Sequence, residues 1–180
     1  MKKIFASVLL ALIPIFVFSQ SLSSFELSKE WLTKIEKIAP EGKGLKVKKN
    51  ILIFSLHTGF NHWTIPHTEA VMKLIAEKSN DFNVTVSKDI SVFDKKNIKK
   101  FDAIILNNNC SDRERRDLLW DALQSDINLS EKQRLKKAKK LENNLLNHIK
   151  KGNGVMMMHG GIVMQNNSQA FSQMAGGSFD

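Results

Sequence analysis

The feature that most constrains the fold is a continuous apolar run of strand length, ILIFSL, at residues 51–56. Continuous apolar strands are typical of parallel sheets, which helices cover on both faces. Three further strands are predicted downstream, at residues 83–89, 102–109 and 155–158. Helical spacing of apolar residues separates them, over residues 67–82 and over one or two helices within 113–126 and 128–152. This alternation predicts an α/β domain with a mostly parallel sheet and right-handed crossovers.

Two helix boundaries can be assigned from local signals. Residues 21–40 have amphipathic spacing, with Ser24 or Ser28 as a possible cap and Pro40 as a stop. Ser130 followed by Gln133 has the spacing of a capping box at the start of the long basic helix. We therefore expect an N-terminal helix and linker at 21–49 and a single domain that begins at residue 50.

The first twenty residues have the pattern of a secretory signal peptide. Lys2 and Lys3 precede an apolar stretch from Ile4 to Phe18, and the small residue Ser19 follows. An uncleaved anchor is the alternative interpretation, but the apolar run is short for a membrane span. The pattern predicts export to the periplasm or the medium, with no stable membrane insertion after cleavage.

The charge of the chain is basic, with a formal net charge of +9. Much of the excess lies in residues 131–151, which could bind an anionic polymer or surface, or could be the solvated face of a helix. No nucleic-acid motif is present, so no nucleic-acid partner is expected. Cys110 is the only cysteine, which excludes an internal disulfide.

Polar clusters follow three of the predicted strands, where a parallel sheet places its ligand site. These clusters are residues 57–62, 107–112 and 159–161. Because the carboxyl ends of parallel strands lie at one edge of the sheet, we expect the three clusters to converge there.

The cluster after the last strand is a histidine followed by two glycines, His159-Gly160-Gly161. Small neighbours allow a sharp turn that lifts one side chain above the sheet, as in the nucleophile elbow of hydrolases. An imidazole in that place can act as a general base or a hydrogen-bond donor. The alternative is a histidine that only caps the sheet.

The other two clusters offer further contacts. We expect His62 to contact a polar substrate, with Phe60 and Trp63 as an aromatic wall for a sugar ring. Asn107 and Asn108 can bind hydroxyl groups or, equally, fix a turn.

Two other chemistries, a zinc site and a cysteine nucleophile, are not predicted. A zinc site from His57, His62 and His159 has no acidic or cysteine ligand beside it. Cys110 follows a different strand from the histidine turn, and nearby Asp112 would raise the pKa of its thiol, which argues against a nucleophile.

Taken together, four segments resemble the ThuA-like (trehalose-utilisation) family over residues 50–180. They are ILIFSLHTGFNHWTIPHTEAV, FDAIILNNNCSD, the Leu-Ser-x-x-Gln helix leading to GVMMMHGGIV, and MAGGSFD. The resemblance implies a three-layer flavodoxin-like sandwich of the class I glutamine amidotransferase-like superfamily. It also places His62, Asn107, Asn108 and His159 around a pocket.

The chain departs from that family in several ways. Asn61 stands where the family often has arginine, and residues 113–127 look like an insertion. True amidotransferases have cysteine where this chain has His159, so glutamine hydrolysis is not expected. Family members continue past the position of Asp180, so the chain is expected to be the N-terminal portion of such a domain, with an incomplete sheet.

The function expected from these features is the binding or processing of a carbohydrate or keto-sugar. His159 and His62 would be the catalytic groups of a hydrolase or isomerase, and Asn107, Asn108, Phe60, Trp63 and Gly160 would contact the substrate. The sequence does not indicate which cofactor, if any, the protein uses. The alternatives are a non-catalytic carbohydrate-binding domain and a basic surface-binding module.

Overall fold

The computed structural model describes residues 26–178, whose four strands form one parallel sheet in the order β2-β1-β3-β4. The elements run in chain order as α1 (Lys29–Ile38), β1 (Lys49–Phe54), α2 (Ile65–Ser79), β2 (Phe82–Ser87), the 3₁₀ turn η1 (Ile90–Phe93), α3 (Lys95–Ile98), β3 (Ala103–Asn107), α4 (Leu118–Asp121), α5 (Glu131–Lys150), β4 (Gly154–Met158), the 3₁₀ turn η2 (His159–Val163) and α6 (Gln169–Ala175). The predicted α/β, flavodoxin-like class is confirmed.

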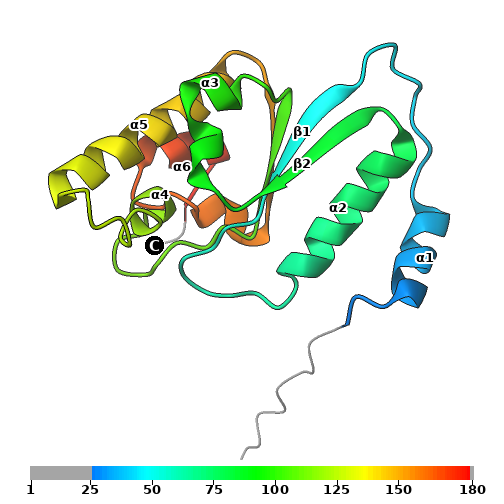
Figure 1. The fold of residues 1–180 in the computed structure, drawn as a ribbon, viewed down its shortest axis with the longest axis horizontal. Helices are drawn as coiled ribbons and strands as arrows, with labels where there is room; N and C mark the ends of the chain where they lie inside the picture. The colour runs from blue at the N-terminus through cyan, green and yellow to red at the C-terminus, as the bar shows by residue number, and fades with distance from the viewer. Residues whose placement is uncertain (1–25, 179–180) are drawn as a thin grey trace, which may run out of the picture.

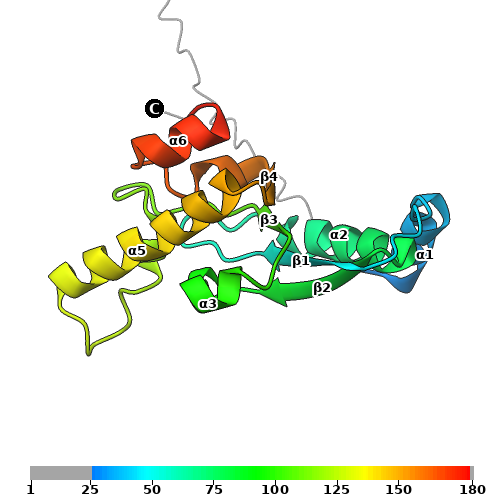
Figure 2. The ribbon, with the colours of Figure 1, turned by 90° about the horizontal axis from the view of Figure 1, so that it is seen from above.

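Helices cover the two faces of the sheet. Figures 1 and 2 both show α1 and α2 on one side of the sheet and α3 to α6 on the other. Leu52 and Phe54 of β1 belong to the main core, which α5 covers with Leu141 and Leu145. Ile53 between them is also fully buried, and alternation along the strand turns it to the α2 side. Burial on both faces explains the continuous apolar sequence of β1.

The register of the sheet brings the carboxyl ends of three strands together. Phe54 at the end of β1 pairs with Leu106 of β3, and Asn107 at the end of β3 pairs with Met158 of β4. The loops that leave β1, β3 and β4 therefore start side by side, as the strand pattern predicted.

The N-terminal helix begins where one of the two predicted caps lies. The Ser28 side chain accepts a hydrogen bond from the Trp31 backbone N–H, and α1 ends before Pro40. Lys78 of α2 then donates to the carbonyl oxygens of Glu36 and Ala39, at 2.8 Å each. This lysine fastens the C-terminal end of α1 to α2.

The start of α5 confirms the predicted capping box. The Ser130 side chain accepts from the Gln133 N–H, and the Gln133 side chain accepts from the Ser130 N–H at 2.8 Å. Within residues 26–178, neither α5 nor any other helix is both long and apolar enough to cross a membrane. The predicted signal peptide, residues 1–20, lies outside the described residues.

The helix predicted within residues 113–126 is much shorter than expected. Only α4, of four residues, forms there, with Asp117 accepting from the Trp120 N–H as its cap. Before it, the Arg116 N–H bonds to the Asp112 carbonyl oxygen and Arg116 takes a left-handed φ of 58°. A left-handed residue cannot continue a helix, so residues 112–116 form a turn instead.

The methionines of β4, Met156 to Met158, are less buried than the apolar residues of β1. Met156 is 49% exposed, and the other two are only partly buried. Within the described residues β4 pairs with β3 alone, so it is an edge strand with less cover.

His148, buried near the end of α5, should make stability depend on pH. Burial, and to a smaller extent the positive charge of Lys151, lower its pKa, while hydrogen bonding to the Phe101 backbone and the charge of Asp102 act against them. The unfolded chain therefore takes up the proton first, and stability should fall as pH drops below about 6.5 towards the lowered value.

The measurement is the melting temperature between about pH 7 and about pH 5, where the carboxylates with lowered pKa values do not yet titrate. His148→Gln should lessen the fall, and His62→Gln with it should lessen it further, because the pKa of His62 is lowered too. An unchanged slope in the double variant would contradict the argument.

Candidate functional site

The three polar loops meet at the carboxyl edge of the sheet and are bonded to one another. The N–H groups of Thr58 and Gly59 both donate to the Cys110 carbonyl oxygen at 2.9 Å. The Asn108 N–H donates to the Met158 carbonyl oxygen at 3.1 Å. These bonds hold the β1 and β4 loops against the β3 loop.

A pocket of about 840 Å³ opens among these loops. Four of the residues predicted for the site line it: Phe60, His62, His159 and Gly160. The remaining lining residues come from the β3 loop, the turn after it and the segment after β4: Cys110, Ser111, Asp112, Arg113, Arg116, Ile162, Val163 and Asn166.

The centre of the site is a pair of histidines from different loops. The ring centroids of His62 and His159 are 4.5 Å apart, with the rings nearly perpendicular at 82°. Burial lowers the pKa of His62, and the positive charges of His159 and His57 lower it further. His62 is therefore a neutral imidazole at neutral pH, which can accept a proton.

The backbone explains why His159 points outward. His159 has a left-handed φ of 45°, and its side chain is exposed at the pocket. A Cβ at Gly160 would lie 2.3 Å from the Cys110 sulfur, and one at Gly161 would lie 2.6 Å from the Leu106 carbonyl oxygen. Only glycines allow the chain to turn this close to the β3 loop.

The aromatic residues predicted for the site lie in two different places. Phe60 is 61% exposed at the pocket, and its ring centroid is 4.6 Å from that of His62. Trp63 instead lines a separate pocket of about 300 Å³ on the α2 side, together with Trp31, His67 and Met158.

The two asparagines predicted to bind substrate are buried and do not belong to the lining of this pocket. Asn107 is 0% exposed, and its Nδ2 donates to Ser55 Oγ and to the Ile65 carbonyl oxygen. Its Oδ1 accepts from Thr68 Oγ1 at 2.6 Å and from Asn108 Nδ2 at 2.9 Å. This network joins β1, β3 and the start of α2.

The carboxylate of Asp121 holds the two loops that form one side of the pocket. Its Oδ2 accepts from Thr58 Oγ1 at 2.6 Å and from the Asp112 N–H at 2.9 Å. Burial raises the pKa of Asp121, although both hydrogen bonds act against the shift.

Cys110 lies in the floor of the pocket, close under Gly160. Burial raises the pKa of its thiol, so the sulfur stays protonated at neutral pH. The cause is burial rather than the charge of Asp112 that the sequence suggested. No three His, Cys, Asp or Glu side chains of residues 26–178 are arranged to hold a metal ion.

The sequence prediction missed the arginines that line the pocket, Arg113 and Arg116. The signal was the segment RERR, which follows the β3 cluster directly and therefore had to begin at the same edge of the sheet. The sequence pattern predicts a helix for this segment, whereas the structure has a turn there that brings Arg113 and Arg116 to the pocket.

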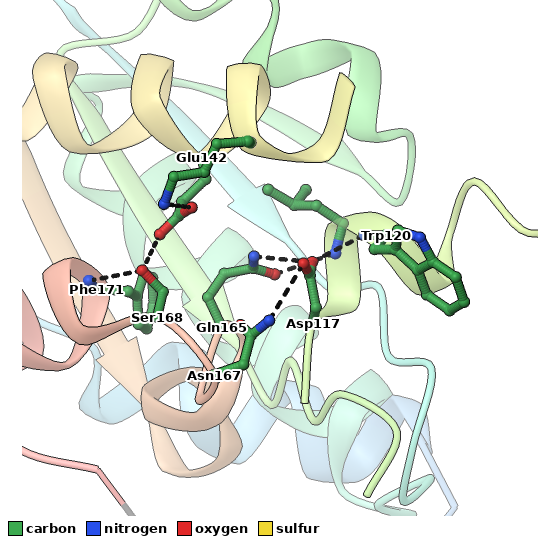
Figure 3. A network of polar contacts seen from close by, with 9 residues as sticks. Asp117, Trp120, Glu142, Gln165, Asn167, Ser168 and Phe171 are labelled. Atoms are coloured by element: carbon green, nitrogen blue, oxygen red, sulfur yellow. Dashed lines mark hydrogen bonds and ion pairs between the residues drawn. The ribbon is translucent and has the colours of Figure 1, made fainter. Parts of the chain in front are cut away.

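A second polar network fastens this turn to the segment after β4 (Figure 3). Asp117 accepts from Gln165 Nε2 at 2.9 Å and from Asn167 Nδ2 at 3.5 Å. Beside it, Ser168 caps α6 and donates to the buried carboxylate of Glu142 on α5. The turn at residues 112–116 and the segment after β4 are thus fixed to each other and to α5.

Comparison with protein families gives a match over most of the chain. The family model ThuA, described as trehalose utilisation, matches residues 50–180, which is the span and the family that the sequence motifs indicated. Searches of curated proteins and of solved structures gave no significant match.

Proposed function

The chain belongs to the ThuA family, and from this premise we propose that its pocket binds and processes a carbohydrate or keto-sugar. Family membership indicates a function related to trehalose utilisation. The observation that carries the proposal is the pair of His62 and His159, which face each other in an open pocket at the carboxyl edge of a parallel sheet.

The two imidazoles suit acid–base chemistry on a sugar. Neutral His62 can take a proton, for example from a carbon next to a carbonyl group, and His159 can donate one to an oxygen on the same substrate. Proton removal from carbon serves isomerisation, whereas in hydrolysis His62 would take the proton from the attacking water and His159 would protonate the leaving oxygen. A cysteine nucleophile does not take part, because burial keeps the Cys110 thiol protonated.

Phe60 supplies an apolar face for the sugar ring. Its side chain is exposed beside His62, and aromatic rings commonly pack against the apolar face of sugars. Asn107 and Asn108 hold the ends of β1 and β3 and the start of α2 together, through the network that they form with Ser55 and Thr68.

A non-catalytic carbohydrate-binding domain is the second candidate. It is favoured by the same exposed Phe60, because a binding platform needs no acid or base. For either function we propose that the protein is exported to the periplasm or the medium, which the signal-like pattern of residues 1–20 supports.

Replacement of His159 by alanine separates the two candidates. An enzyme should lose turnover of a glycoside or keto-glycoside by about 100-fold or more, since a positioned acid or base contributes about that much. Affinity for the same sugar should survive, because Phe60 and the pocket walls remain. The measurement is turnover of a keto-glycoside panel beside calorimetric affinity for the same compounds.

His67→Ala is the matched control, because His67 is buried in the separate pocket on the α2 side. It should leave turnover unchanged in the folded protein. Equal turnover in His159→Ala and in the wild type would exclude catalysis by His159, and sugar binding without any turnover would support the binding domain.

A further inference from the structure

The three arginines of residues 113–116 have different surroundings. Arg115 is held away from the pocket: its guanidinium carbon lies 3.5 Å from the centroid of the Trp120 ring, and its Nη2 pairs with Glu131 Oε1 at 3.2 Å. Arg113 and Arg116 line the pocket together with the histidine pair. The turn therefore carries one arginine outside the pocket and two in the pocket lining.

The charge of the pocket lining is positive. Asp112 is its only acidic residue among those described, against two guanidinium groups. One oxygen of the Asp112 carboxylate accepts the Glu114 N–H at 2.9 Å, which commits it to the turn. A guanidinium presents paired donors that match the geometry of a carboxylate or a phosphate.

The backbone that carries Arg116 is strained but firmly held. Its left-handed φ costs about 1 kcal/mol or more for a residue with a side chain. The Arg116 N–H donates to Asp112, and its carbonyl oxygen accepts from the Asn167 N–H at 3.1 Å. Asp117, the next residue, is bonded to Gln165 and Asn167 (Figure 3).

Strained residues that the surrounding structure holds in place are common at ligand sites. From the two arginines and their rigid support, we propose that the pocket takes a sugar with an anionic substituent, a carboxylate or a phosphate, which Arg113 and Arg116 bind. The substrate class rests on the proposed function of the same pocket. The anionic group would then lie at Arg113 and Arg116, and the reacting part of the sugar would lie at His62 and His159.

The test measures the affinity of the full chain by calorimetry for four probes: D-glucose, D-glucuronate, D-glucose 6-phosphate and inorganic phosphate. The two anionic sugars distinguish carboxylate from phosphate as the preferred group. The wild type should bind at least one of them about tenfold more tightly than glucose at low salt, and higher salt should reduce the difference. The double variant Arg113→Gln/Arg116→Gln should remove the preference, so that the affinity for the anionic sugar falls to about that for glucose.

Arg115→Gln is the matched control, because it removes the same charge from the same turn outside the pocket. It should keep the preference for the anionic sugar, and melting curves establish that all variants are folded. If glucose binds as tightly as the anionic sugars, the inference is overturned while the proposed function stands.

If inorganic phosphate binds through Arg113 and Arg116 but no sugar binds, the anion site stands and the proposed function fails. If none of the four probes binds, or if Arg115→Gln loses the preference as fully as the double variant, the anion site is overturned.

Discussion

Gly59→Ala should dismantle the site by forcing the β1 loop off the β3 loop. A Cβ at this position would lie 2.0 Å from the Ser111 carbonyl oxygen, a backbone atom that cannot turn aside. The Gly59 N–H bond to the Cys110 carbonyl oxygen would be lost as the loop moved. His62, three residues on, would move away from His159.

We expect Gly59→Ala to cost about 3 kcal/mol, as overpacking in a well-packed region does, and to lower the melting temperature by about 9 °C. Sugar binding should disappear at temperatures where the variant is still folded. Thermal melting followed by calorimetry measures both effects.

Gly177→Ala is the control for this substitution, because a Cβ there meets nothing within 4 Å. It should melt as the wild type does and bind normally. A Gly59→Ala protein with the wild-type melting temperature would mean that the two loops are not packed as described.

Asn107→Ala should act mainly on stability, even though its position suggests a substrate contact. Four hydrogen bonds end on this one amide, to Ser55, Ile65, Thr68 and Asn108. Because the site is buried, the partners left behind have no water to bond to, and each unsatisfied group costs about 1 kcal/mol or more. The expected loss is about 3 kcal/mol of unfolding free energy.

Chemical denaturation of Asn107→Ala beside Asn143→Ala tests this expectation. Asn143 lies on the exposed face of α5, and its replacement should leave stability unchanged or slightly higher, since alanine favours helix. If Asn107→Ala instead weakened sugar binding at unchanged stability, Asn107 would be a substrate contact after all.

The continuous apolar run of β1 and the alternation of strands with helices predict a parallel sheet, and the parallel sheet predicts that the three polar loops converge. Neither step needs side-chain detail, because both follow from strand direction and burial on two faces.

The direction of each polar side chain was not predictable in the same way. Asn107 is the last residue of β3, and His159 directly follows β4. The Asn107 side chain nevertheless points into the interior, whereas the His159 side chain points into the pocket. The difference depends on Thr68 and Ser55, which are distant in sequence and provide buried partners for an amide. Sequence spacing alone does not contain this information.

The boundary of α4 shows a similar limit. Asp112 and Asp117 are both acceptable helix caps, and the apolar residues that follow suit either start. The structure uses Asp117, because Gln165 and Asn167 bond to its carboxylate and fix it at the cap. This tertiary contact leaves Arg113 and Arg116 in a turn that faces the pocket.

The position of β4 at the margin of the sheet affects how fast the His62–His159 pair can separate and form again. Within residues 26–178, His159 follows a strand that is hydrogen-bonded on one side, to β3, whereas His62 lies in the loop after a strand bonded on both sides. Local opening that releases β4 would withdraw one imidazole and leave the other in place. The rate at which the His62–His159 pair forms again would then depend on how fast β4 pairs with β3. The bond from the Asn108 N–H to the Met158 carbonyl oxygen lies at the end of that ladder, next to His159.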